Sequence, residues 1–200
     1  MTRQTRNVAF ALLGLAPALV AWSGAAWQLS LVAPKSRLWV EGTSTVRGFT
    51  CRAVTFDVAV DASAPAAAAA IMNGEKAVTG VNVTVPAAKL DCGNGTMNEH
   101  MYKAIKAKDA PTIEFRLASY EMTKGASGMQ GRLTGTLTLG GVQKPVTVEA
   151  TATEDPAGLR VTGMHEVRMK EFGLKPPTLM MGTMKVNELV KVNFDLYLKS

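Results

Sequence analysis

Apolar and polar residues alternate along most of the chain after residue 27, and this period of two limits the possible folds more than any other feature. In the last such segment the apolar positions are Val190, Val192, Phe194, Leu196 and Leu198, with mainly polar residues between them. Residues spaced in this way place one apolar face and one polar face on a β-strand. The pattern therefore predicts strands with one buried and one solvated side.

Similar segments recur along the chain and predict about nine strands, near residues 27–32, 36–43, 50–61, 77–85, 112–121, 130–139, 142–153, 158–169 and 187–198. Turn sequences separate several of them, such as Gly140-Gly141 and the DPAG sequence at 155–158. Strands joined by such short turns are antiparallel neighbours. Since a sheet of this length tends to close on itself, we expect a single all-β domain with an antiparallel barrel.

Two segments interrupt the alternation. The Ala-rich residues 62–70 include Pro65 and predict a loop or short helix across one end of the sheet. Residues 95–107 place Met97, Met101, Ala104 and Ile105 at helical spacing, which predicts a short amphipathic helix that caps the structure. We therefore expect one or two short helices besides the strands.

The N-terminus has the order of charge and hydropathy typical of a secretory signal peptide. Arg3 and Arg6 precede an apolar run at residues 8–20, and small residues follow at 23–26. The run has 13 residues, whereas a membrane span needs about 20. We predict that residues 1–26 are a signal peptide, that residues 27–200 form the mature domain, and that the protein is exported to the periplasm or cell envelope. An uncleaved N-terminal anchor is the alternative.

The chain has two cysteines, Cys51 and Cys92. An even number of cysteines in an exported chain favours a disulfide. Closing a loop of roughly 40 residues would stabilise the fold by about 4 kcal/mol on the chain-entropy model. Two separate buried thiols are the alternative, because Cys51 lies beside an apolar strand.

Six short sequences in register resemble the YceI-like, polyisoprenoid-binding family. They are GTSTVRGF at 42–49, MNEHM at 97–101, APTIEF at 110–115, GRLTGTLTLGGVQKPV at 131–146, FGLKPP at 172–177 and VKVNF at 190–194. The resemblance covers residues 27–200. It implies an elongated, lipocalin-like antiparallel β-barrel whose lumen holds a long isoprenoid chain, such as a quinone tail. In this family the ligand contacts are mostly apolar and spread over many strands, and the cysteine pair departs from its simplest members.

The alternation also predicts which side chains line the lumen, because the residues between them are mainly polar. We assign to the interior Leu38, Val40, Phe56, Val58, Ile113, Phe115, Leu137, Leu139, Val148, Val161, Val192, Phe194 and Leu196. Further candidate ligand contacts are His165, Phe172, Met180, Met181 and Met184. Flexible methionine side chains suit a pocket for a floppy chain.

Few residues have the arrangement that catalysis requires. We expect His100 to be a solvated helix residue, and His165 to be either a hydrogen-bonded interior imidazole or a contact for a ligand's polar head. Neighbouring residues of a strand face opposite sides, so His165 and Glu166 are a poor metal pair. We predict no enzymatic activity, no cofactor and no metal, with a copper site at Met180, Met181 and Met184 as an alternative.

The remaining charge is small. Without Arg3 and Arg6 the formal net charge falls from +6 to +4, and the basic residues are scattered, so we expect no nucleic-acid partner. The leading hypothesis is a carrier or store for a polyisoprenoid or other long-chain lipid in the cell envelope, with transient contact at a membrane surface. The alternatives are an envelope stress or interaction module with a packed barrel, and a periplasmic copper binder.

Overall fold

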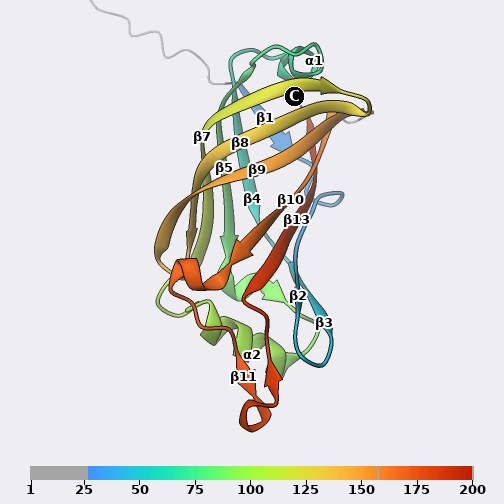
Figure 1. Ribbon diagram of the computed structural model, residues 1–200. Coiled ribbons are helices and arrows are strands. Elements are labelled where there is room, and N and C mark those ends of the chain that lie inside the picture. The colour runs from blue at the N-terminus through green and yellow to red at the C-terminus, as the bar shows by residue number, and fades with distance from the viewer. Residues whose placement is uncertain (1–26, 157, 200) are drawn as a thin grey trace, which may run out of the picture.

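The computed structural model describes residues 27–156 and 158–199; the predicted signal peptide lies outside them. Figure 1 shows an elongated shell of strands with one helix near each end. The strands are β1 (Trp27–Leu31), β2 (Arg37–Thr43), β3 (Gly48–Ala53), β4 (Asp57–Ala62), β5 (Val78–Pro86), β6 (Leu90–Asp91), β7 (Thr112–Gly125), β8 (Gly128–Leu139), β9 (Val142–Asp155), β10 (Gly158–Arg168), β11 (Thr178–Leu179), β12 (Met184–Lys185) and β13 (Leu189–Lys199). The helices are α1 (Ala67–Met72) and α2 (Gly95–Ala104), with short 3-10 turns η1 (Ala87–Lys89), η2 (Met169–Phe172) and η3 (Met180–Gly182).

Eight antiparallel strands form a closed ring in the order β1-β4-β5-β7-β8-β9-β10-β13, and β1 pairs with β13 to complete it. One edge of β13 serves two strands, since Leu198 and Lys199 pair with β1 whereas residues 191–195 pair with β2. From β2 the sheet continues to β3 and β6, which extend the wall beyond the ring. The predicted all-β antiparallel barrel is confirmed.

The segment predicted as one strand at residues 50–61 is two strands. Between β3 and β4 the backbone N–H of Val54 donates to the carbonyl of Lys89 at 2.8 Å. The chain leaves β2 there, and β4 takes β1 and β5 as new partners. The break shifts the phase of the alternation, since the inward positions are odd-numbered in β3, as at Cys51, and even-numbered in β4, as at Val58, while Val54 between them is 65% exposed. The two-residue strands β6, β11 and β12 are too short to show any period.

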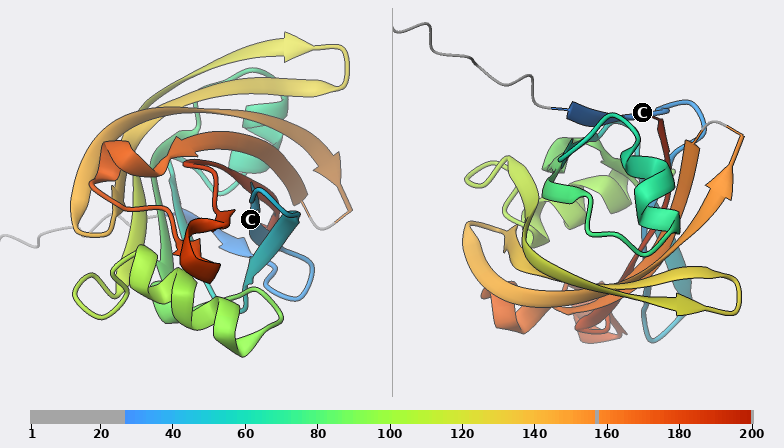
Figure 2. Two further views of the ribbon diagram at one scale, coloured as in Figure 1. Left: turned by 60° about the horizontal axis from the view of Figure 1, so that its bottom comes forward. Right: turned by 90° about the horizontal axis from the view of Figure 1, so that it is seen from above.

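The two helices lie at opposite ends of the barrel, and Figure 2 shows α2 with the bottom of the molecule turned forward and α1 from above. In α1, Ala67 and Ile71 are buried against the strands. The other helix, α2, is capped at its N-terminus by Asn94, whose side chain accepts a hydrogen bond from the backbone N–H of Met97 at 3.0 Å. Near its end the Tyr102 hydroxyl donates to the carbonyl of Leu90 in β6 at 2.8 Å. The short helices predicted from the two interruptions are therefore present.

Toward the α2 end of the barrel, β9 and β10 separate. Their pairing ends at Met164 and Glu149, although each strand continues for several residues. The segment that follows β10 fills this interval and buries Met169, Phe172 and Leu174. Figure 1 shows η2 between the lower ends of the two strands. This part of the wall is therefore closed by irregular chain rather than by a ladder.

A charged pair on the outside of the wall joins β10 to β13. Arg160 donates two hydrogen bonds to the carboxylate of Asp195, at 2.8 and 3.0 Å. The guanidinium of Arg37 in β2 lies 3.5 Å from the same carboxylate. Asp195 is 5% exposed. The hydrogen bonds from Arg160 hold the pKa of Asp195 below its usual range.

Within the described ranges, no helix has the length and apolar character needed to span a membrane.

Candidate functional site

The barrel encloses a cavity of about 740 Å³ that extends from α1 to α2. Its wall consists almost entirely of aliphatic and aromatic side chains from the inward faces of the strands. These positions face inward because they alternate with the outward-facing polar residues of the same strands. The volume lies within the range of about 300–1,000 Å³ that is common for small-molecule pockets.

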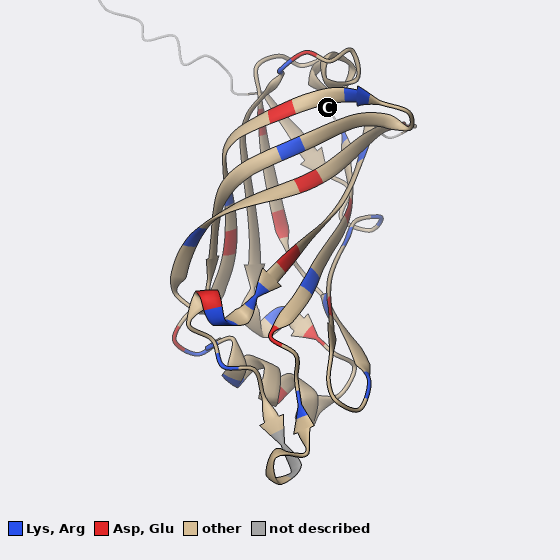
Figure 3. Cartoon of the chain, in the orientation of Figure 1, with Lys and Arg blue, Asp and Glu red and all other residues tan. Residues whose placement is uncertain are grey.

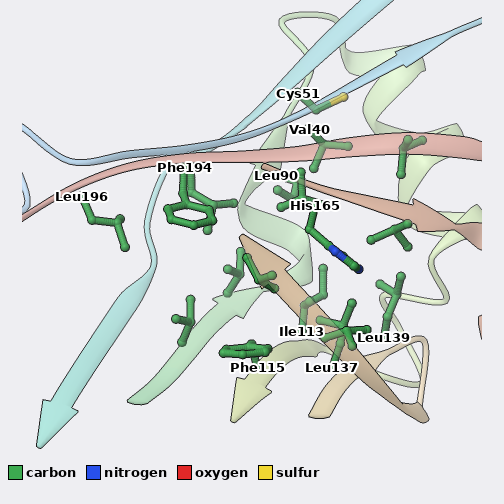
Figure 4. Close-up of a pocket in the computed structure, with 18 of the residues that line it drawn as sticks. Val40, Cys51, Leu90, Ile113, Phe115, Leu137, Leu139, His165, Phe194 and Leu196 are labelled. Atoms are coloured by element: carbon green, nitrogen blue, oxygen red, sulfur yellow. The ribbon is translucent and has the colours of Figure 1, made fainter. Parts of the chain in front are cut away.

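Most of the residues predicted to line the lumen lie in the cavity wall. They are Leu38, Val40, Val58, Ile113, Phe115, Leu137, Leu139, Val148, Val161, His165, Met184, Val192, Phe194 and Leu196. Figure 4 shows Phe194 and Leu196 on one side of the space, with Phe115 and Leu137 across from them. These side chains come from segments far apart in the sequence, and the closure of the barrel brings them together.

Four predicted positions are placed differently or lie outside the description. One cluster of buried residues, which includes Val167, Met169 and Leu174, lies toward the α2 end, and we name it the lower core cluster. Phe56 is half-buried at the break between β3 and β4 and packs against this cluster. Phe172 is 2% exposed and belongs to that cluster, because η2 fills the gap between β9 and β10 rather than facing the lumen. Met181 is fully exposed at the tip of the β11–β12 hairpin. The side chain of Met180 lies outside the described part of the structure.

The cavity wall is not packed like a protein core. Wall residues such as Ile113, Phe115 and Phe194 point inward and yet are only half-buried. The largest fully buried side chains are Leu159 near α1, Leu174 toward the α2 end, and the disulfide-bonded Cys51, and the two leucines belong to buried clusters at opposite ends of the lumen. Protein interiors are ordinarily as dense as organic crystals. The middle of this barrel therefore has open space between its opposite walls.

Two phenylalanine rings lie against glycines of neighbouring strands. The ring of Phe194 occupies the place that a Cβ on Gly163 would need, and the ring of Phe115 does the same at Gly135. A glycine lets an aromatic ring from the next strand cover its backbone closely. The rings therefore lie along the wall and leave the centre of the lumen open.

His165 is a polar residue in an apolar part of the wall. Its position on β10 pairs with Val192, which pairs with Val40 and then with Cys51, so the four form one inward-facing row across four strands. Figure 4 shows the imidazole projecting into the cavity. Among the described residues, none makes a hydrogen bond to its ring. The imidazole thus has no protein partner in the part of the chain that the structure describes, and its ring faces the cavity.

The cavity reaches the surface at the α2 end. Its exposed lining residues are Arg47, Asn94 and Thr96, and all three lie there. At the α1 end the lining residues Ile71 and Met129 are buried. The lumen is therefore closed at the α1 end and opens beside α2, and we name the α2 end the mouth.

The predicted disulfide between Cys51 and Cys92 is confirmed. Both cysteines line the cavity, and the bond ties β3 to the segment that precedes α2. The backbone N–H of Cys92 also donates to the side chain of Asn98 at 2.7 Å. These contacts fix α2 at the edge of the mouth.

His100 faces the cavity at the mouth rather than being a fully solvated helix residue. In the residues that the structure describes, no group of three or more His, Cys, Asp or Glu could hold a metal ion. Met181 is exposed while Met184 lines the cavity, so these two thioethers have different surroundings.

Sequence reasoning missed part of the lining. Met97, Met101 and Ile105 of the α2 segment contribute to the wall near the mouth, and Ile71 of α1 contributes at the closed end. The helical spacing of the α2 residues indicated an apolar face, which could have assigned them to the lumen. The strand pattern holds no signal for the open mouth, because the pattern describes faces and not ends.

Comparisons with known proteins agree with this architecture. The YceI-like domain family matches residues 29–198. A UPF0312 protein from Enterobacter sp. (strain 638) is 33% identical over 100 residues, which cover 47% of this chain and 51% of the relative. The matched region thus spans about half the length of that relative.

Two solved structures share the fold. BcnA from Burkholderia cenocepacia has a TM-score of 0.68 at 21% identity, with 86% of this chain and 100% of that chain covered. A polyisoprenoid binding domain from Saccharophagus degradans has a TM-score of 0.58 at 13% identity, with 86% and 97% covered. Because the family match extends over nearly the whole described structure, the chain belongs to the YceI-like domain family.

Proposed function

We propose that the protein binds a long apolar lipid, of the polyisoprenoid or isoprenoid-quinone class, in the barrel lumen and stores or transports it. The observation that carries this proposal is the open space of about 740 Å³ between apolar walls that do not pack against each other. A structural neighbour is described as a polyisoprenoid binding domain, which supports the choice of ligand class. We propose a binding role and no catalytic one.

The energetics suit a carrier. Transfer of a chain of about forty carbons out of water is favourable by roughly 0.8 kcal/mol per methylene. The summed free energy would exceed the practical limit of non-covalent binding, about 18–21 kcal/mol. The relevant competitor is a bilayer, in which the chain is already out of water. The net free energy of transfer from membrane to lumen can then lie near zero, and this permits both loading and release.

His165 is the candidate for a specific polar contact inside the lumen. Its ring faces the cavity, and an imidazole nitrogen can donate or accept one hydrogen bond. A carbonyl or hydroxyl group of the ligand would satisfy this capacity. If the imidazole faced only an apolar part of the ligand, its unsatisfied nitrogen would cost about 1–3 kcal/mol of binding free energy. His165 would therefore favour ligands whose polar group lies next to it in the lumen.

We infer that the protein acts in the periplasm or cell envelope. The Cys51–Cys92 disulfide is of the kind that persists in oxidising compartments. The charge and hydropathy pattern of residues 1–26 supports the same location. Loading and release would then take place at a membrane surface that the protein contacts transiently.

Binding can be tested with delipidated protein and two probes, a long-chain isoprenoid alcohol and a quinone with an isoprenoid tail. Val148 lines the cavity, whereas its neighbour Thr147 is exposed on the outer face. We expect Val148→Trp to bind much less probe, because the new ring occupies the lumen. Thr147→Trp is the matched control and should bind as much as the parent protein.

Unfolding measurements on the same variants separate loss of space from loss of fold. Adding a large ring to a packed core costs about 1–3 kcal/mol, whereas an open lumen should accept it at little cost. The proposal is overturned if the parent protein binds neither probe. Equal binding by parent and Val148→Trp would overturn it as well.

A further inference from the structure

Two hairpins meet at the mouth of the cavity. The β2–β3 loop, residues 44–47, lies beside the β11–β12 hairpin, residues 178–185, and a bridge between Ser44 and Val186 joins them. The backbone N–H of Thr45 donates to the carbonyl of Lys185 at 2.9 Å, and the Thr45 hydroxyl donates to the carbonyl of Thr183 at 3.0 Å. We name this pair of hairpins the mouth loops; they form one connected projection.

Each mouth loop exposes a large apolar side chain. Val46 is 65% exposed in one loop and Met181 is fully exposed in the other. Figure 1 shows the β11–β12 hairpin projecting beyond the barrel at the end opposite α1. Exposed apolar side chains that gather at a cavity entrance indicate a contact surface more strongly than scattered ones do.

The charge around these side chains is positive. Arg47 and Lys185 belong to the mouth loops, and the sequence has no Asp or Glu at residues 42–56 or 172–187. Figure 3 shows basic and no acidic positions on the two hairpins. Within the described structure, neither Arg47 nor Lys185 has a carboxylate partner. Around α2, Asp91 and Glu99 add two negative charges and Lys103 one positive charge, so the basic excess belongs to the mouth loops themselves.

We propose that the mouth loops dock the barrel on an anionic lipid surface, with Val46 and Met181 inserted at the headgroup boundary. Apolar side chains beside basic ones are the combination that binds to such an interface. The cavity opens between the loops and α2, so docking here would place the mouth against the membrane. This inference rests on the proposed lipid-carrying function and names the face that exchanges the lipid.

The experiment measures flotation of the protein, purified from an exporting host, with vesicles of phosphatidylethanolamine and phosphatidylglycerol. Val46→Asp should lower the partition coefficient about tenfold, because it replaces the inserted apolar group with an anion. Lys185→Gln should lower it about fivefold, the usual effect of one basic residue near such a surface. Neither residue lines the cavity.

The chain offers matched controls at other sites. Val54 is exposed to the same fraction as Val46, 65%, but lies between β3 and β4, and Lys124 lies in the β7–β8 hairpin at the α1 end. Val54→Asp and Lys124→Gln should float like the parent protein. Equal losses for Val46→Asp and Val54→Asp would overturn the inference, and so would a parent protein that does not float.

Lipid extracted from the same preparations separates the two proposals. A parent protein that contains lipid but does not float would refute the docking face and leave the carrier function standing. A protein that floats through Val46 but never contains or binds an isoprenoid would instead refute the carrier function. Flotation that is unchanged by anionic lipid but lost after removal of a co-purifying protein would indicate a protein partner at this face and overturn the inference.

Discussion

Phe194 and Phe172 form a matched pair for asking whether the barrel is hollow. Phe194 lines the cavity and is half-buried, while Phe172 is 2% exposed within the lower core cluster. Truncation of a packed phenylalanine to alanine costs about 3–5 kcal/mol, because it removes the transfer free energy and leaves a void. We expect that cost for Phe172→Ala.

Phe194→Ala should cost less. One side of its ring covers Gly163, but the other faces space that is already open, so little new void forms. Only part of the transfer free energy is lost, about 1–2 kcal/mol. The two variants should therefore differ by about 2 kcal/mol, which corresponds to about 4–8 °C in Tm for a domain of this size.

The assay is thermal and urea unfolding of delipidated protein, repeated with added isoprenoid quinone. A ligand that binds only the folded state raises stability by mass action. This gain should shrink in Phe194→Ala and persist in Phe172→Ala. If both variants lose several kcal/mol without ligand and neither parent nor variant responds to quinone, the lumen is a packed core and the reasoning is wrong.

Three further expectations follow from the structure. Because hydrogen bonds from Arg160 lower the pKa of Asp195, the ionised carboxylate stabilises the fold above its ordinary pKa; Asp195→Asn should therefore cost about 2 kcal/mol at neutral pH. That cost should shrink as the pH falls below about 4, and a pH-independent difference in urea unfolding would contradict it. Reduction of Cys51–Cys92 should lower the free energy of unfolding by about 4 kcal/mol, whereas unchanged urea unfolding under reducing conditions would refute this. The intact mass from an exporting host should match a chain that starts at residue 26 or 27, and a full-length mass in the membrane fraction would disprove cleavage.

The strand pattern was sufficient to predict the barrel and most of its inner face. Alternation at positions such as Phe115 and Phe194 identifies one face of each strand, and a closed antiparallel sheet has only one interior for those faces to share. The same reasoning failed at Phe172. Its segment shows no period of two, and the gap between β9 and β10 that it fills depends on where a ladder ends.

The mouth could not be predicted from the strands. Its position depends on the contacts that hold α2 and the two hairpins at one end, including the bond between Cys92 and Cys51 and the bridge from Ser44 to Val186. These contacts join segments whose sequences are short and irregular. Likewise, the sequence alone could not show whether the inner face packs or stays open, because the same apolar residues suit both.

Native mass spectrometry of the protein purified gently from an exporting host tests the central claim most directly. The intact complex should carry one apolar lipid, and collisional release should yield a molecule whose fragments differ by isoprene units. The Val148→Trp variant, prepared in parallel, should lose most of this adduct, while Thr147→Trp should keep it. A parent protein that has only the mass of the bare chain, and that takes up no isoprenoid when one is supplied during folding, would contradict the account.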